Sequence, residues 1–318
     1  MEITKQEHLQ NVLDSHRMAH ISELFDKFKE KREDVKEALE ANYTSSIYSP
    51  INSGSFAKYT AINVKFDLDL VVPFKRNSFD TLENMFNDVY EFLQEEYRDQ
   101  AYIRPQKVSI GIEFYPDNDG NSISLDIVPG RELNQNQYFD DKKLNLYVNS
   151  TYGLLDEKSY IQTNIQAQID HIKARENERK IIRLLKIWKT HNSEKYKSFL
   201  LELLTIKAFE KEVISGNLWE KLKSFMTYIK DNITKEGFTL IDPGNSGNDV
   251  MDSLNNFERQ SLSGRMDLIL KNIENNEDNI LIYFPLNNEF ADEKNSKNGY
   301  GVKKNSNYSV PPPVQRFG

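Results

Sequence analysis

Two aspartates interrupt an apolar segment near residue 70. Asp67 and Asp69 lie within FDLDLVVPF (66–74), which otherwise has the alternation and β-branched residues of a strand. Successive side chains of a strand point to opposite faces, so both carboxylates are expected on one face, about 6.6 Å apart at roughly 3.3 Å per residue. Two charges inside such a strand are costly unless something compensates them. The segment therefore predicts a site that binds a cation.

A third carboxylate occupies a comparable place further along the chain. Asp126 lies in SISLDIV (122–128), flanked by Leu125 and Ile127. If this strand lies beside the first, the three carboxylates converge, and they raise one another's pKa unless a cation neutralises them. Hard oxygen ligands suit Mg²⁺ or Mn²⁺. Two such ions, roughly 3.5–4 Å apart, can hold the attacking and leaving oxygens of a phosphoryl transfer.

A Gly-Ser pair precedes the aspartates and supplies the second part of the pattern. Gly54 and Ser55 are expected near the start of a helix, where free backbone N–H groups attract anions. Glycine lets the backbone approach a triphosphate closely, and the serine hydroxyl adds a donor. Lys58 could add a positive charge. These residues are therefore predicted to bind a nucleotide.

The whole-chain composition excludes several classes of protein. The chain has 318 residues, no cysteine, a net charge of −8, 38% hydrophobic residues and 28% charged residues. This is a globular composition without a disulfide framework or a thiolate zinc site. No apolar run reaches the roughly 20 residues of a membrane span. The negative net charge argues against a protein whose main task is to coat the phosphate backbone of a nucleic acid. We expect a cytoplasmic protein that does not bind membranes.

Periodicity predicts a mixed first half and a helical second half. One or two amphipathic helices are expected over 3–41 and another over 77–97, strands over 66–74, 107–115 and 122–128, and helices from about residue 161. The fold class is α+β. The expected domains are a mixed core with N-terminal helices at 1–160, a helical domain at 161–290 and a flexible tail at 291–318.

Gly-Ser, then D-x-D, then a later lone aspartate on a strand is the pattern of the polymerase-β-like nucleotidyltransferases. Each part alone is weak, because D-x-D often marks only an edge strand with one wet face, but the ordered combination is specific. GSFAKYTAINVKFDLDLVVPF resembles the corresponding segment of the oligoadenylate synthases. RLLKIWKTH, FLLELLTIKAFE and LIDPGNSGNDV resemble their later helices and loop. The resemblance spans roughly residues 50–250, and it implies that 1–160 is a nucleotidyltransferase core and that 161–290 closes its nucleotide cleft.

Without a cysteine zinc element and with an acidic composition, the chain resembles the bacterial branch, the cGAS/DncV-like nucleotidyltransferases (CD-NTases) of anti-phage signalling operons. The resemblance implies two Mg²⁺ or Mn²⁺ ions, NTP substrates, a cyclic di- or trinucleotide product and a downstream effector that the product activates. It also implies triphosphate contacts from Lys186 and Ser198 in the helical half, although a lysine on an amphipathic helix is usually solvated and Ser198 stands where an N-cap is expected. We do not expect a nucleic-acid activator.

Two other functions stay open at this point. The chain could make linear oligonucleotides or add nucleotides to an RNA end or a protein, although the net charge of −8 gives little support to a nucleic-acid substrate. It could also be an inactive nucleotide-binding regulator, against which the complete set Asp67, Asp69 and Asp126 speaks.

The chain ends in PPPVQRFG, in which three prolines favour an extended polyproline II segment. A frayed terminus is the simplest interpretation. Some bacterial members of the resembled family are attached to targets through a C-terminal glycine by a ubiquitin-activating-like partner. The resemblance therefore implies a conjugation role for Gly318.

Overall fold

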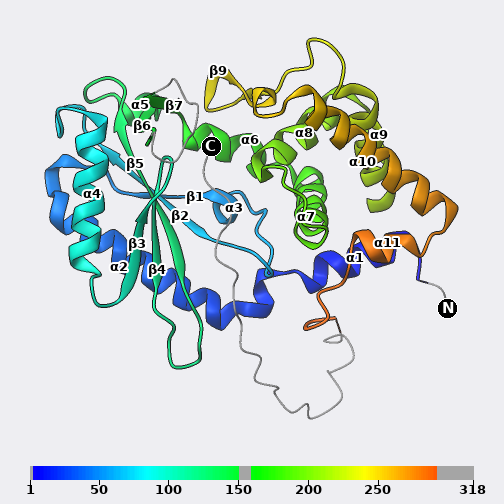
Figure 1. The fold of residues 1–318 in the computed structure, drawn as a ribbon, viewed down its shortest axis with the longest axis horizontal. Helices are drawn as coiled ribbons and strands as arrows, with labels where there is room; N and C mark the ends of the chain where they lie inside the picture. Colours follow the sequence, from blue (N-terminus) through cyan, green and yellow to red (C-terminus); the bar gives the residue numbers. More distant parts are fainter. Residues whose placement is uncertain (1–2, 150–158, 292–318) are drawn as a thin grey trace.

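A seven-stranded mixed sheet forms the first half of the chain in the computed structural model, which describes residues 3–149 and 159–291 (Figure 1). Its main path runs in the order β1-β2-β5-β4-β3, and β6 pairs with both β5 and β7. The strands are β1 (Ile51–Ser53), β2 (Leu68–Phe74), β3 (Ala101–Pro105), β4 (Ile110–Phe114), β5 (Ser124–Glu132), β6 (Leu144–Tyr147) and β7 (Tyr160–Thr163).

The central strand β2 is buried along its whole length. Leu68, Leu70 and Val72 join one core, which α2 (Ser22–Tyr43) and α4 (Leu82–Glu96) cover, whereas Val71 joins a second core on the other face. Both faces are therefore packed, which explains the continuous apolar run. The predicted strand 66–74 is two residues shorter than expected at its start, so Asp67 precedes β2.

The N-terminal helical region is broken into α1 (Lys5–Ser15), a 3₁₀ turn η1 (Met18–Ile21) and α2. A capping box of Thr4 and Glu7 starts α1. The break sends the two helices to different cores, since the buried side chains of α2 pack on the sheet and those of α1 join the helical half. Figure 1 shows α2 along the sheet and α1 near α11.

The second half is mostly helical, as predicted, and the α+β fold class is confirmed. Its one interruption in the described residues is a small hairpin of β8 (Ile241–Asp242) and β9 (Asn245–Asp249), where the sequence predicts a loop. The main helices are α6 (Ile165–Lys173), α7 (Glu176–His191), α8 (Ser198–Lys211), α9 (Leu218–Asn232), α10 (Asn256–Asn275) and α11 (Asn279–Tyr283).

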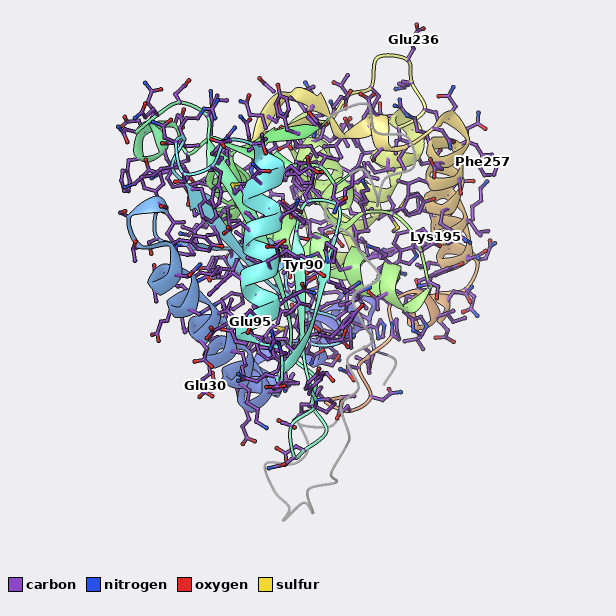
Figure 2. All side chains as sticks on the ribbon, turned by 60° about the vertical axis from the view of Figure 1, so that its left-hand side comes forward. Glu30, Tyr90, Glu95, Lys195, Glu236 and Phe257 are labelled. Atoms are coloured by element: carbon purple, nitrogen blue, oxygen red, sulfur yellow. The ribbon has the colours of Figure 1, made fainter. Side chains whose placement is uncertain are left out.

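The division into domains at residue 160 stays a prediction, and two elements cross it. Buried Leu9, Val12 and Leu13 of α1 belong to the helical core, and β7 carries the sheet beyond residue 160. Charged side chains such as Glu30, Glu95 and Lys195 cover the outer surface (Figure 2). None of the described helices is long and apolar enough to cross a bilayer.

Candidate active site

Two of the three predicted carboxylates lie side by side. β2 pairs with β5 in parallel, in a register that places Asp69 opposite Asp126. Each of these residues is only 3% exposed. The predicted convergence of the two strands is therefore confirmed, and it comes from a parallel pairing between strands whose aspartates are far apart in the sequence.

Asp67 completes the acidic cluster from the segment just before β2, where it is partly buried. Burial raises the pKa of Asp69 well above its usual range, and the charges of Asp67 and Asp126 raise it further. Burial, together with the charge of Asp67, raises the pKa of Asp126 to about 7. Burial also raises the pKa of Asp67, which Lys186 opposes. Three carboxylates thus act on one another in a poorly solvated place.

The hydrogen bonds of the two paired carboxylates differ. Gln106 Nε2 donates to Asp126 Oδ1 at 2.8 Å, whereas Asp69 Oδ1 is buried and has no hydrogen-bond partner in the structure. An unsatisfied buried carboxylate oxygen is rare and is typical of a place that a ligand or ion fills. The donor set suits Mg²⁺ or Mn²⁺. No three His, Asp or Glu side chains of the described residues are yet arranged to hold a metal, so the complete site stays a prediction.

Gly54 lies directly against Asp69, which explains why a glycine precedes the aspartates. Its φ is +65°, and a Cβ at this position would lie 1.5 Å from Asp69 Oδ2. The helix α3 (Gly54–Ala57) begins at Gly54 itself and has a single turn. Ser55 is its second residue. The nucleotide-binding roles of Gly54 and Ser55 stay predictions, but their place beside the carboxylates fits those roles.

Lys58, at the end of α3, is paired with a residue that the sequence analysis did not identify. Its Nζ donates to Glu202 Oε1 of α8 at 2.9 Å, and both side chains are buried. Its ammonium also lies 4.7 Å from the ring centroid of Phe199. The signal for Glu202 was a carboxylate within the apolar run FLLELLTIKAFE. The nucleotide contact predicted for Lys58 is untested, and in this structure the lysine joins the two halves.

Lys186 is buried and faces the first half of the chain. Its Nζ donates to Thr60 O at 3.0 Å and to Thr60 Oγ1 at 2.9 Å. Burial lowers its pKa to about 8, and Glu202 opposes that change. The alternative of a solvated lysine is therefore wrong. The structure brings Lys186 close enough for its charge to act on Asp67.

Ser198 does not cap its helix. Lys197 occupies the N-cap and Ser198 is the first residue of α8, so the expected cap is wrong. Instead, the Ser198 hydroxyl accepts a hydrogen bond from Lys189 Nζ at 3.3 Å. Lys189 is a buried residue that the sequence analysis missed, and burial, with Lys65 and Lys186 nearby, lowers its pKa to about 7. Of these two buried amines of α7, Lys186 is the one whose charge acts on Asp67 and Asp69.

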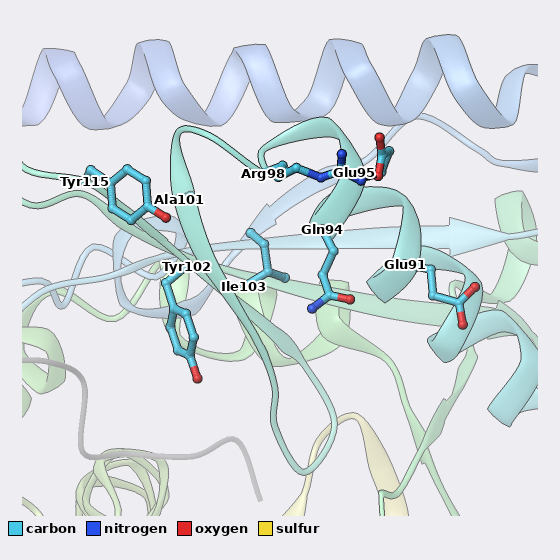
Figure 3. Close-up of a pocket in the computed structure, with 8 residues that line it drawn as sticks. All are labelled: Glu91, Gln94, Glu95, Arg98, Ala101, Tyr102, Ile103 and Tyr115. Atoms are coloured by element: carbon cyan, nitrogen blue, oxygen red, sulfur yellow. Dashed lines mark hydrogen bonds and ion pairs between the residues drawn. The ribbon is translucent and has the colours of Figure 1, made fainter.

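A separate hollow of about 460 Å³ lies between α4 and the edge strand β3, where Tyr102 and Tyr115 flank it (Figure 3). It contains none of the predicted site residues. Gly318, the predicted conjugation residue, lies outside the described residues.

The contact between Gly54 and Asp69 predicts a steep cost for a single methyl group. Gly54→Ala should lower the free energy of unfolding by at least about 2 kcal/mol, because it adds both a clash and a left-handed residue. Gly120→Ala is the matched control, since Gly120 has a φ of +81° and open space around its Cβ. It should cost only about 1 kcal/mol. Urea unfolding of both variants measures this, and equal losses would contradict the contact.

The raised pKa of Asp126 predicts a pH-dependent stability in metal-free buffer. The folded carboxyl keeps its proton up to about pH 7, whereas the unfolded one releases it near its usual value of 3.8. The contribution of this group to stability is therefore present below about pH 4 and is lost as the pH rises to about 7. The difference in stability between Asp126→Asn and the wild type should grow in favour of the variant over that interval. Thermal unfolding with EDTA measures it, and a constant difference would refute it.

Comparisons with known proteins point to one family. No model of a protein family matches the chain. A CBASS oligonucleotide cyclase, CdnC, of Escherichia coli (strain KTE188) is 27% identical over 211 residues, which are 62% of this chain and 61% of the relative. The match thus spans less than two thirds of that protein. A cyclic AMP-AMP-AMP synthase of Escherichia coli (strain MS 115-1) is 24% identical over 228 residues, 66% of this chain and 67% of the relative.

The fold agrees with these relatives. The structure of E. coli MS115-1 CdnC with ATP superposes with a TM-score of 0.67, at 19% identity, over 89% of this chain and 96% of that one. Because the superposition covers 89% of this chain, it extends over parts of both the sheet and the helical half. The chain is therefore similar in sequence to CBASS oligonucleotide cyclases, and it has the fold of the solved CD-NTase structures, the bacterial cGAS-like nucleotidyltransferases.

Proposed function

We propose that this chain joins NTPs without a template and closes the product into a cyclic di- or trinucleotide that activates a downstream effector in cytoplasmic anti-phage signalling. The observation that carries the proposal is the placement of Asp69, which lies between Asp126 on β5 and Gly54 at the start of α3. This placement brings together the carboxylates and the backbone turn that a nucleotidyl transfer needs.

Each part of the site has a proposed task. Asp67, Asp69 and Asp126 would hold two Mg²⁺ or Mn²⁺ ions, which supply charge stabilisation for the transferring phosphoryl group. The backbone at Gly54 and Ser55 would approach the triphosphate, because no side chain separates this turn from Asp69. Lys186 and Ser198 would bind the triphosphate from α7 and α8.

The relatives support the choice of product. One is named an oligonucleotide cyclase and another a cyclic AMP-AMP-AMP synthase, and a CdnC structure contains ATP. We propose ATP as at least one substrate on this ground. A cyclic product also fits a single carboxylate set, since a linear intermediate can be released and bind again in the opposite orientation.

The product can be identified directly. Purified protein is incubated with the four labelled NTPs and Mg²⁺ or Mn²⁺, and the products are treated with phosphatase. A cyclic product has no terminal phosphate, so label should remain in phosphatase-resistant material. Linear, phosphatase-sensitive products alone would favour an oligonucleotide or terminal transferase, and the absence of any transfer would favour a nucleotide-binding regulator.

The carboxylates can be tested in the same assay. The double variant Asp67→Asn, Asp69→Asn should fold and lose at least about a hundredfold in rate, because neutral amides bind divalent ions poorly. It should also be no less stable than the wild type in metal-free buffer, since the repulsion with Asp126 is relieved. Asp117→Asn, on the hairpin between β4 and β5, is a control that should retain activity. A folded double variant with normal synthesis would exclude these roles.

A further inference from the structure

Three consecutive residues of the first half each contact the helical half. Lys58 pairs with Glu202 of α8, and the ring of Tyr59 lies against Arg179 of α7, with 5.3 Å between the ring centroid and Cζ. Thr60 accepts both hydrogen bonds from Lys186 of α7. This short segment follows α3 directly, so it links the predicted nucleotide turn to both helices.

Tyr59 has a backbone conformation that tyrosine rarely adopts. Its φ is +56°, in the left-handed region. Tyr59 N–H donates to Phe56 O at 3.0 Å and Thr60 N–H donates to Ser55 O at 2.9 Å. These two bonds form a Schellman motif that ends α3, and Tyr59 occupies the position where glycine is usual. Because glycine would fit this turn without strain, the ring of Tyr59 must serve another purpose.

The contact with Arg179 supplies that purpose. Tyr59 is 56% exposed, so burial of the ring in a core does not explain it. Arg179 Nε is buried and has no hydrogen-bond partner, and the guanidinium forms no ion pair with a described residue. The tyrosine ring is therefore the group that holds this cation from the first half of the chain.

We propose that Tyr59 is a positioning residue, whose stacking on Arg179 fixes the turn after α3 against α7 and so preorganises the site for nucleotide. The left-handed turn sends the Tyr59 ring toward Arg179, while its neighbours Lys58 and Thr60 reach Glu202 and Lys186. The nucleotide part of this inference rests on the proposed function. The contact between the two halves does not.

Four variants separate the ring from the backbone. Tyr59→Gly keeps the turn and removes its strain. If the ring had no positioning role, this variant would bind nucleotide at least as tightly as the wild type. We expect instead that Tyr59→Gly and Arg179→Ala each raise the Kd for a non-hydrolysable ATP analogue with Mg²⁺ about threefold to fivefold. Tyr59→Phe keeps the ring and should match the wild type. Lys180→Ala removes the next charge on α7, which pairs with Glu176 on the same helix, and should also match it.

Calorimetry with the analogue measures these affinities, and unchanged binding in Tyr59→Gly would overturn the proposal. In steady-state assays the same variants should raise KM and leave kcat nearly unchanged, since the carboxylates on β2 and β5 are not altered. A fall in kcat at constant KM would also contradict a positioning role.

A double-mutant cycle tests the contact without nucleotide. Arg179→Ala should lower the unfolding temperature of the wild type but not that of Tyr59→Gly, because the stacking partner is already absent there. Equal losses in both backgrounds would overturn the contact, whatever the protein catalyses. If the two substitutions are coupled but the protein does not bind the analogue, the contact is confirmed. Its role in nucleotide binding is then refuted, and the result counts against the proposed function.

Discussion

The parallel pairing of β2 with β5 is the constraint on which the site depends. It places Asp69 beside Asp126 in a buried position, where the charge of Asp126 disfavours ionisation of Asp69. A register slip of one residue would turn Asp69 to the opposite face of the sheet and fill its place with an apolar side chain. Because both faces of β2 are packed, the sheet cannot make that slip without exposing Leu68, Leu70 and Val72.

Two glycines make this arrangement possible by leaving room for polar groups. A Cβ at Gly54 would meet the Asp69 carboxylate, and a Cβ at Gly111 would lie 2.5 Å from Gln106 Nε2. Gln106 is the residue that donates to Asp126. Gly54 thus leaves space beside Asp69, which has an oxygen without a partner. Gly111 leaves space for the Gln106 amide, which donates to Asp126. Because Asp126 has this hydrogen bond and Asp69 Oδ1 has none, Asp69 is the carboxylate most in need of an external ligand.

Local patterns in the sequence predicted three of the strands, β2, β4 and β5, and the helical second half, whereas the pairing of the two aspartate strands was only a condition for the site. They left open whether residues 3–41 form one helix or two, because no glycine or proline marks the break and α1 and α2 separate only to reach different cores. The sequence did not predict the partner of Lys58 either. Glu202 is distant in the sequence, and only the packing of α8 against the turn after α3 brings the two together. Ser198 was misjudged because capping was inferred from residue type, whereas the helix begins at Ser198 itself, one residue earlier than a cap at Ser198 would require.

The charge balance of the site also exists only when both halves meet. Lys186 lowers the pKa of Asp67, and in return Asp67 and Asp69 raise the pKa of Lys186. The sheet supplies the carboxylates, and α7 supplies the amines Lys186 and Lys189, each with a pKa that burial lowers. The overall charge of −8 therefore says little about this site, where buried charges of both signs oppose one another. Since the helical half supplies Glu202 to Lys58 and Lys186 to Thr60 and Asp67, the packing of the helical half on the sheet is a condition for the site and not merely a cover over it.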